Sequence, residues 1–212
     1  MTITLNNLIK NHFMKHLILY SIIILSFTIG ISTGAFTVNA LSFSQIEELS
    51  EYIQEFFYVI NMQTVNHMDL LKFSILNNIK IIVVLWILGM TIIGIPFIVI
   101  VIGIKGFVIG FTVGFLIKCL SFKGVLFAIL GILPQNLILV PCYIFLGITC
   151  MNFSLSMIRS TSRTKYKKED FKVQFLSYCV LLAFVALIMM IGSVVEAYFT
   201  PVFIKMLTAS IV

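Results

Sequence analysis

The chain has 212 residues, of which 60% are hydrophobic and only 10% are charged. Water-soluble domains carry roughly 25% charged residues, so this composition excludes an ordinary soluble domain and indicates a protein surrounded by the lipid bilayer. The formal net charge of +6 does not predict a nucleic-acid partner, because the basic residues gather at the edges of apolar segments, where they set membrane topology.

The first apolar segment, residues 17–38, is predicted to be a transmembrane helix. Lys10 and Lys15 precede it, which favours a cytoplasmic N-terminus. A cleaved signal peptide is the alternative, but the segment exceeds the roughly 7 to 15 apolar residues of a signal core. We therefore expect an uncleaved anchor.

Residues 39–78 form the one extended segment with a water-compatible composition, and we expect it outside the cytoplasm. Ser44 and Glu47 have capping-box spacing, and apolar residues recur at helical spacing after them, which predicts an amphipathic helix over residues 44–60. Its apolar face has three open interpretations: packing on the chain's own bundle, lying in the headgroup layer, or docking a partner protein. The candidate docking residues are Ile46, Leu49, Ile53 and Phe57.

The next apolar stretch is too long for one crossing, since a span needs about 20 residues, and it predicts two helices over residues 75–94 and 96–118. The break between them is placed at Gly94–Pro96, with Gly103–Gly106 as the rival. The first choice leaves Lys105 inside a span, where a charge is costly. No acidic partner is evident within the spans, so we expect its long side chain to reach the inner interface.

Three glycines at four-residue spacing follow in the second of these helices: Gly106, Gly110 and Gly114. Small residues at this spacing form a ridge against which another helix backbone can pack closely. Helix packing is the expected role. A bend that lines a pathway is the alternative.

Residues 122–133 are too short to cross the hydrocarbon region and predict a partial helix, re-entrant or interfacial. Pro134, Gln135 and Asn136 are expected to end it, with the two amides bonding carbonyls that the break leaves free; a substrate-binding role is the alternative. Residues 137–158 and 173–195 predict the last two spans, joined by a basic cytoplasmic loop over residues 159–172. The predicted fold is therefore all-α: a polytopic bundle of five transmembrane helices, one partial helix and one extracytoplasmic amphipathic helix.

The sequence contains no pattern typical of catalysis. The four cysteines lie in apolar stretches without metal-binding spacing, and no phosphate-binding loop is present. We expect no enzymatic activity, no cofactor and no metal site. Glu196, just after the last predicted span, is interpreted as an interfacial carboxylate, with a contact to a partner as the alternative.

Several sequence blocks, in order along the chain, resemble one known family. They are 39-NALSFSQ-45, 86-WILG-89, Gly94-Ile95-Pro96, Lys105-Gly106 running into 110-GFTVGF-115, 133-LPQN-136, and 196-EAY-198 with Pro201. Together they are similar to stage II sporulation protein M. The resemblance implies a scaffold in the mother-cell membrane at the sporulation septum, which recruits the peptidoglycan-degrading stage II sporulation proteins D and P. The chemistry would then belong to those partners.

A transport function is the alternative to the scaffold. A five-span bundle with a partial helix and a basic cytoplasmic loop is also typical of the membrane subunit of an exporter that works with a separate ATPase.

Overall fold

The computed structural model describes residues 2–62, 66–161 and 168–208, and these residues form helices with no strand among them, which confirms the all-α prediction. Five segments are long and apolar enough to cross a membrane. The elements are α1 (Thr2–Ala40), α2 (Phe43–Met62), α3 (His67–Gly89), α4 (Gly94–Leu120), α5 (Phe122–Phe127), the π-helix η1 (Ala128–Ile132), α6 (Leu133–Thr161) and α7 (Lys168–Thr208).

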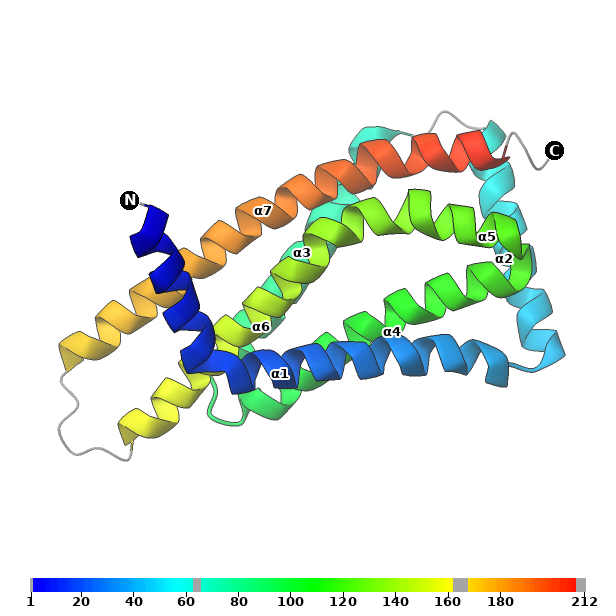
Figure 1. Ribbon diagram of the computed structural model, residues 1–212. Helices are drawn as coiled ribbons and strands as arrows, with labels where there is room; N and C mark the ends of the chain where they lie inside the picture. Colours follow the sequence, from blue (N-terminus) through cyan, green and yellow to red (C-terminus); the bar gives the residue numbers. More distant parts are fainter. Residues whose placement is uncertain (1, 63–65, 162–167, 209–212) are drawn as a thin grey trace.

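The membrane-spanning helices run along one long axis, and α2 lies across one end of the bundle (Figure 1). The start of α3, the turn between α4 and α5, and the last turns of α7 lie at this end, which we call the α2 end. The end of α6 and the start of α7 lie at the opposite end. The described residues on both sides of the predicted basic loop, 159–161 and 168–172, lie at that opposite end, so the positive-inside rule predicts that the α2 end faces away from the cytoplasm. Residues 162–167 of this loop lie outside the described residues.

Helix α6 lies at the centre of the bundle and contacts α1, α3, α4 and α7. Its buried residues form one apolar core with side chains of those four helices, including Ile23, Leu85, Ile102, Leu146 and Met189. The outer surfaces of the same helices are also apolar; Leu25 is 64% exposed and Phe184 is 61% exposed. Such a surface requires a hydrocarbon solvent, as the composition predicted.

The turn between α3 and α4 decides the ambiguous break. Helix α3 ends at Gly89 and α4 begins at Gly94, so the chain folds back next to the Gly94–Pro96 site. The rival break at Gly103–Gly106 is wrong, because those residues lie within α4 and keep its helical backbone. Ser154 of α6 donates a hydrogen bond from its Oγ to the Thr91 carbonyl at 2.7 Å and so ties the turn to the core.

The predicted helix break at Pro134, Gln135 and Asn136 is also wrong. Helix α5 continues through η1 into α6, and residues Phe122–Ile158 form one membrane-spanning segment. Pro134 lacks the N–H of a helical residue, and its ring crowds the preceding turn. The chain absorbs this with a wider π-helical turn instead of a break, and the rod bends over α4 (Figure 1).

The two helices that begin within residues 39–78 start at other residues than predicted. Helix α2 begins at Phe43, and the capping residues are Ser42 and Gln45, because the Gln45 side chain accepts the Ser42 backbone N–H at 3.0 Å. Helix α3 begins at His67 behind the N-cap Asn66, whose side chain accepts the Met68 N–H at 3.1 Å. The span therefore starts within the stretch predicted to be extracytoplasmic.

Candidate functional site

A chain of buried polar side chains links α3, α6 and α7 inside the membrane-spanning region. Tyr143 donates its hydroxyl to Asn78 Oδ1 at 2.6 Å, and the Asn78 amide donates to Ser193 Oγ at 2.8 Å. One turn toward the α2 end, Ser74 donates its hydroxyl to Glu196 Oε2 at 2.5 Å. Ser74, Asn78 and Ser193 are almost completely buried, so these bonds satisfy groups that lipid could not solvate.

A cavity of about 190 Å³ adjoins these hydrogen-bonded side chains, and two residues of opposite charge line it. Lys105 of α4 and Glu196 of α7 both line it, and the Lys105 ammonium lies 5.5 Å from the centre of the Tyr143 ring. The expectation that no carboxylate accompanies Lys105 is therefore wrong. Helix α7 continues past residue 195 and places Glu196 beside Ser74 of α3, so this carboxylate lines the cavity as well as lying near the end of the last span.

Two of the three predicted corner residues line the same cavity. Gln135 and Asn136 face it from the start of α6. The Asn136 amide donates to the Ile132 carbonyl at 2.8 Å, and Gln135 Oε1 accepts from Thr200 Oγ1 at 3.4 Å. Thr200 also bonds the Gly131 carbonyl at 3.2 Å, so α7 and the amides supply partners for the π-helical turn. Pro134 explains the turn but is not among the residues that line the cavity.

The three predicted packing glycines lie against α1. A Cβ atom added to Gly106 would come 2.3 Å from the Phe27 carbonyl oxygen, and one added to Gly110 would come 2.1 Å from that of Ile31. At Gly114 the nearest atom would be the Cα of Ala35, at 3.2 Å. The two backbones are therefore in direct contact, a geometry that only glycine permits.

Helix α1 contributes its own glycines to this contact, and sequence reasoning missed them. A Cβ at Gly30 would lie 2.1 Å from the Gly103 carbonyl oxygen, and one at Gly34 would lie 2.2 Å from that of Phe107. The signal was available, since Gly30 and Gly34 have the same four-residue spacing as the ridge on α4.

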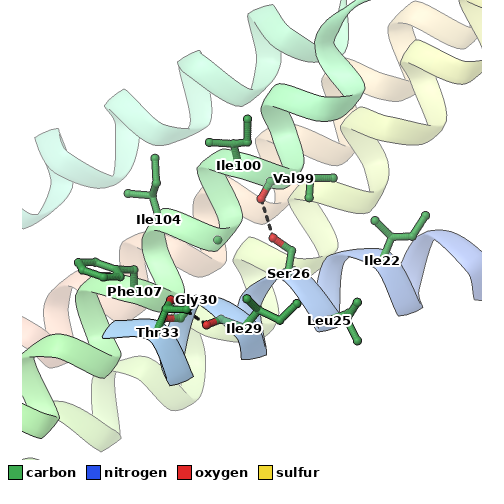
Figure 2. A pocket seen from close by; sticks show the side chains of 11 residues that line it. Ile22, Leu25, Ser26, Ile29, Gly30, Thr33, Val99, Ile100, Ile104 and Phe107 are labelled. Carbon is green, nitrogen blue, oxygen red and sulfur yellow. Dashed lines mark hydrogen bonds between the residues drawn. The ribbon is translucent and has the colours of Figure 1, made fainter. Parts of the chain in front are cut away.

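A lipid-facing groove follows the α1–α4 contact. Figure 2 shows Ser26 on its floor with its Oγ directed at the Val99 carbonyl, to which it donates a hydrogen bond at 2.8 Å. Thr33 likewise bonds the Gly30 carbonyl at 2.9 Å. Because both hydroxyls are engaged within the protein, the groove presents an essentially apolar surface bordered by Ile22, Ile100, Ile104 and Phe107.

Helix α2 has one face on the bundle and another open to solvent. Of the four predicted docking residues, Ile53 packs against Leu116 and Phe127, and Ile46 and Leu49 are half-buried. The side chain of Phe57 lies outside the described part of the structure. The open face is acidic and aromatic, with a surface groove of about 560 Å³ lined by Leu41, Gln45, Glu48, Leu49, Glu51, Tyr52 and Glu55.

Contacts at the α2 end hold α3 and α7 together. His67 Nδ1 lies 3.0 Å from the Ala197 carbonyl oxygen, and the His67 ring stacks on Tyr198 with the ring centres 5.3 Å apart. Among the described residues, no three His, Cys, Asp or Glu side chains are arranged to bind a metal ion. The four cysteines are free thiols; Cys142 and Cys150 are buried.

The sequence of the chain matches the model of a known family. The family model described as stage II sporulation protein M matches residues 23–201, from within α1 to the Pro201 position of α7, and so covers the three middle spans completely and most of the first and the last. The chain belongs to the stage II sporulation protein M family. The resemblance noted in the sequence is thereby confirmed, and the multi-span bundle described above is the form that this member of the family takes. No curated protein matches the chain, and no solved structure does.

Proposed function

We propose that the chain is a non-enzymatic membrane scaffold of the sporulation engulfment machinery. It recruits and anchors peptidoglycan-degrading partners, the stage II sporulation proteins D and P, in the mother-cell membrane at the sporulation septum. Membership of the family supports this role. The structural observation that carries it is α2, a helix held across one end of the bundle with its acidic face unoccupied.

The open face of α2 has the properties of a protein-docking surface. Tyr52 is 71% exposed and lines the groove, and aromatic residues of this kind commonly supply binding energy at interfaces. Glu48, Glu51 and Glu55 line the groove next to Tyr52, so the complementary partner segment is basic. Because Ile53 is already packed on the bundle, docking uses this acidic face together with Leu49 instead of the whole apolar face.

Charge reversal on α2 tests this role. The double variant Glu51→Lys, Glu55→Lys is expected to abolish septal localisation of fluorescently tagged D and P proteins in sporulating cells, while its own level in the membrane stays unchanged. Glu47→Lys is the matched control, because Glu47 is an exposed glutamate of the same helix that does not line the groove. Normal recruitment by the double variant would exclude this face as the docking surface.

The intramembrane cavity favours transport as a second candidate function. Charged and amide side chains facing a cavity within the membrane are typical of substrate sites in transporters. Co-purification separates the two functions. A scaffold retains wall hydrolases from solubilised sporulating cells, whereas the membrane subunit of an exporter retains a nucleotide-binding chain.

A further inference from the structure

Lys105 and Glu196 line the same cavity, yet no direct ion pair joins them in the described part of the chain. The Lys105 ammonium has three N–H groups, and the contact found for it is with the face of the Tyr143 ring. Glu196 accepts a hydrogen bond from Ser74 on Oε2 and none from any described residue on Oε1. Each charge therefore has unused hydrogen-bonding capacity directed into a shared space.

Such charges are costly within the bilayer unless something polar compensates them. A group that offers an anionic acceptor to Lys105 and a cationic N–H donor to Glu196 compensates both charges. The Gln135 amide nitrogen makes no hydrogen bond with a described residue, so it suits the same occupant as a donor. Asn78 is already engaged, as a donor to Ser193 and as an acceptor from Tyr143. A ligand that carries an anionic and a cationic group a few bonds apart satisfies both walls at once.

The cavity opens sideways toward lipid. Val108, on its α4 wall, is 52% exposed, and Thr112 and Asn77 are exposed as well. All three lie within segments that span the membrane, so the entrance faces the bilayer. A volume of about 190 Å³ equals roughly six water molecules at about 30 Å³ each, which suits a compact polar group and excludes a whole lipid.

We propose that this cavity binds the headgroup of a zwitterionic phospholipid that carries a primary ammonium, phosphatidylethanolamine. The phosphate accepts hydrogen bonds from Lys105, and the ammonium donates to Glu196, while the acyl chains stay in the surrounding bilayer. A quaternary ammonium, as in phosphatidylcholine, has no N–H to donate to Glu196. Phosphatidylglycerol has no cation at all.

Native mass spectrometry of the purified full chain tests the proposal. Delipidated protein is offered equal amounts of phosphatidylethanolamine, phosphatidylcholine and phosphatidylglycerol. We expect the first to be retained about tenfold more than the other two, the ratio expected from one charge-assisted hydrogen bond. Equal retention of the three lipids would overturn the proposal, and so would displacement by soluble phosphoethanolamine at the same concentration, because the source would then be aqueous.

Substitutions of Lys105 and Glu196 test whether the lipid preference arises at this cavity. Glu196→Gln should remove the preference for phosphatidylethanolamine, and Lys105→Met should lower retention of all three lipids, whereas Lys105→Arg should keep it. Lys72→Met is the matched control, since Lys72 is an exposed lysine of α3 outside the cavity. If Glu196→Gln and Lys105→Met retain lipids as Lys72→Met does, the site is elsewhere. Each variant must elute as a single species, and the preference of the unmodified chain remains decisive if one of them does not fold.

Discussion

The contact between α1 and α4 gives the sharpest prediction about stability, and Gly110→Ala tests it with one added carbon. The new Cβ would lie 2.1 Å from the Ile31 carbonyl oxygen, and ordinary van der Waals contact begins at 3.4 Å, so the helices must separate by about 1.3 Å. The Ile31 carbonyl belongs to the backbone, and the backbone also fixes the position of the new Cβ, so no side-chain rotation relieves the clash. Overpacking of this kind costs about 1 to 3 kcal/mol, and we expect the upper half of that range.

The free energy of unfolding is measured by titrating the purified protein from mild detergent into sodium dodecyl sulfate and following tryptophan fluorescence. Trp86 is the single tryptophan of the chain and packs against the core, so its signal reports on the bundle. Gly131→Ala is the matched control. Its Cβ would meet the ring of Phe127 at 3.6 Å, and a compatible glycine-to-alanine change in a helix shifts stability by at most about 1 kcal/mol, usually upward.

Equal unfolding free energies for Gly110→Ala and Gly131→Ala would refute the reasoning, because they would show that α1 and α4 are not in backbone contact at Ile31. A loss for Gly110→Ala that Gly131→Ala does not share supports the contact.

Three further substitutions are measured in the same titration. Ser121 has a φ of 50°, which L residues adopt only with strain, so Ser121→Gly should stabilise the chain by about 1 kcal/mol; a loss of stability would contradict that conformation. Asn78→Leu leaves the buried Tyr143 hydroxyl without its acceptor, while Ser193 keeps its bond to the Met189 carbonyl, and should cost about 1 to 3 kcal/mol; a neutral effect would exclude this set of hydrogen bonds. Lys118 donates to the Val38 carbonyl at the end of α1 at 2.7 Å, so Lys118→Met should cost about 0.5 to 1 kcal/mol, with no change as the contrary result.

The number and rough position of the spans could be predicted from the sequence because hydrocarbon imposes the strongest local rule in the chain. Apolar length shows how many crossings the chain can make. Turn chemistry at Gly94 placed the break between α3 and α4 correctly among two candidates. These features depend on residues close together in the sequence, and each local signal points to the same fold.

The structure differs from the sequence-based prediction where contacts between segments distant in the sequence determine the local conformation. Pro134 has the local signature of a helix end. However, Thr200 of α7 donates a hydrogen bond to the Gly131 carbonyl, and this bond stabilises a continuous π-helical turn in the membrane. Glu196 has the signature of an interface residue, and its hydrogen-bond donor Ser74 lies on another helix and far away in the sequence. The cavity could therefore not be predicted from the sequence pattern, in which Lys105 and Glu196 lie far apart.

Helix α2 shows an intermediate case. Its existence and amphipathic character follow from the spacing of Ile46, Leu49 and Ile53, but the assignment of its two faces does not. The apolar face pattern fits a partner protein and the chain's own bundle equally well. Packing of Ile53 on Leu116 and Phe127 resolves this in favour of the bundle and leaves the acidic face free.

The central claim is that α2 is displayed outside the cytoplasm by a five-span bundle. Cysteine labelling in intact cells tests it most directly, with Tyr52→Cys, on the exposed face of α2, introduced into a chain whose native cysteines are replaced by serine or alanine. We predict that a membrane-impermeant maleimide labels residue 52 without permeabilisation, while a cysteine at residue 164 reacts only after the membrane is opened. The reverse pattern would contradict both the orientation and the proposed docking surface.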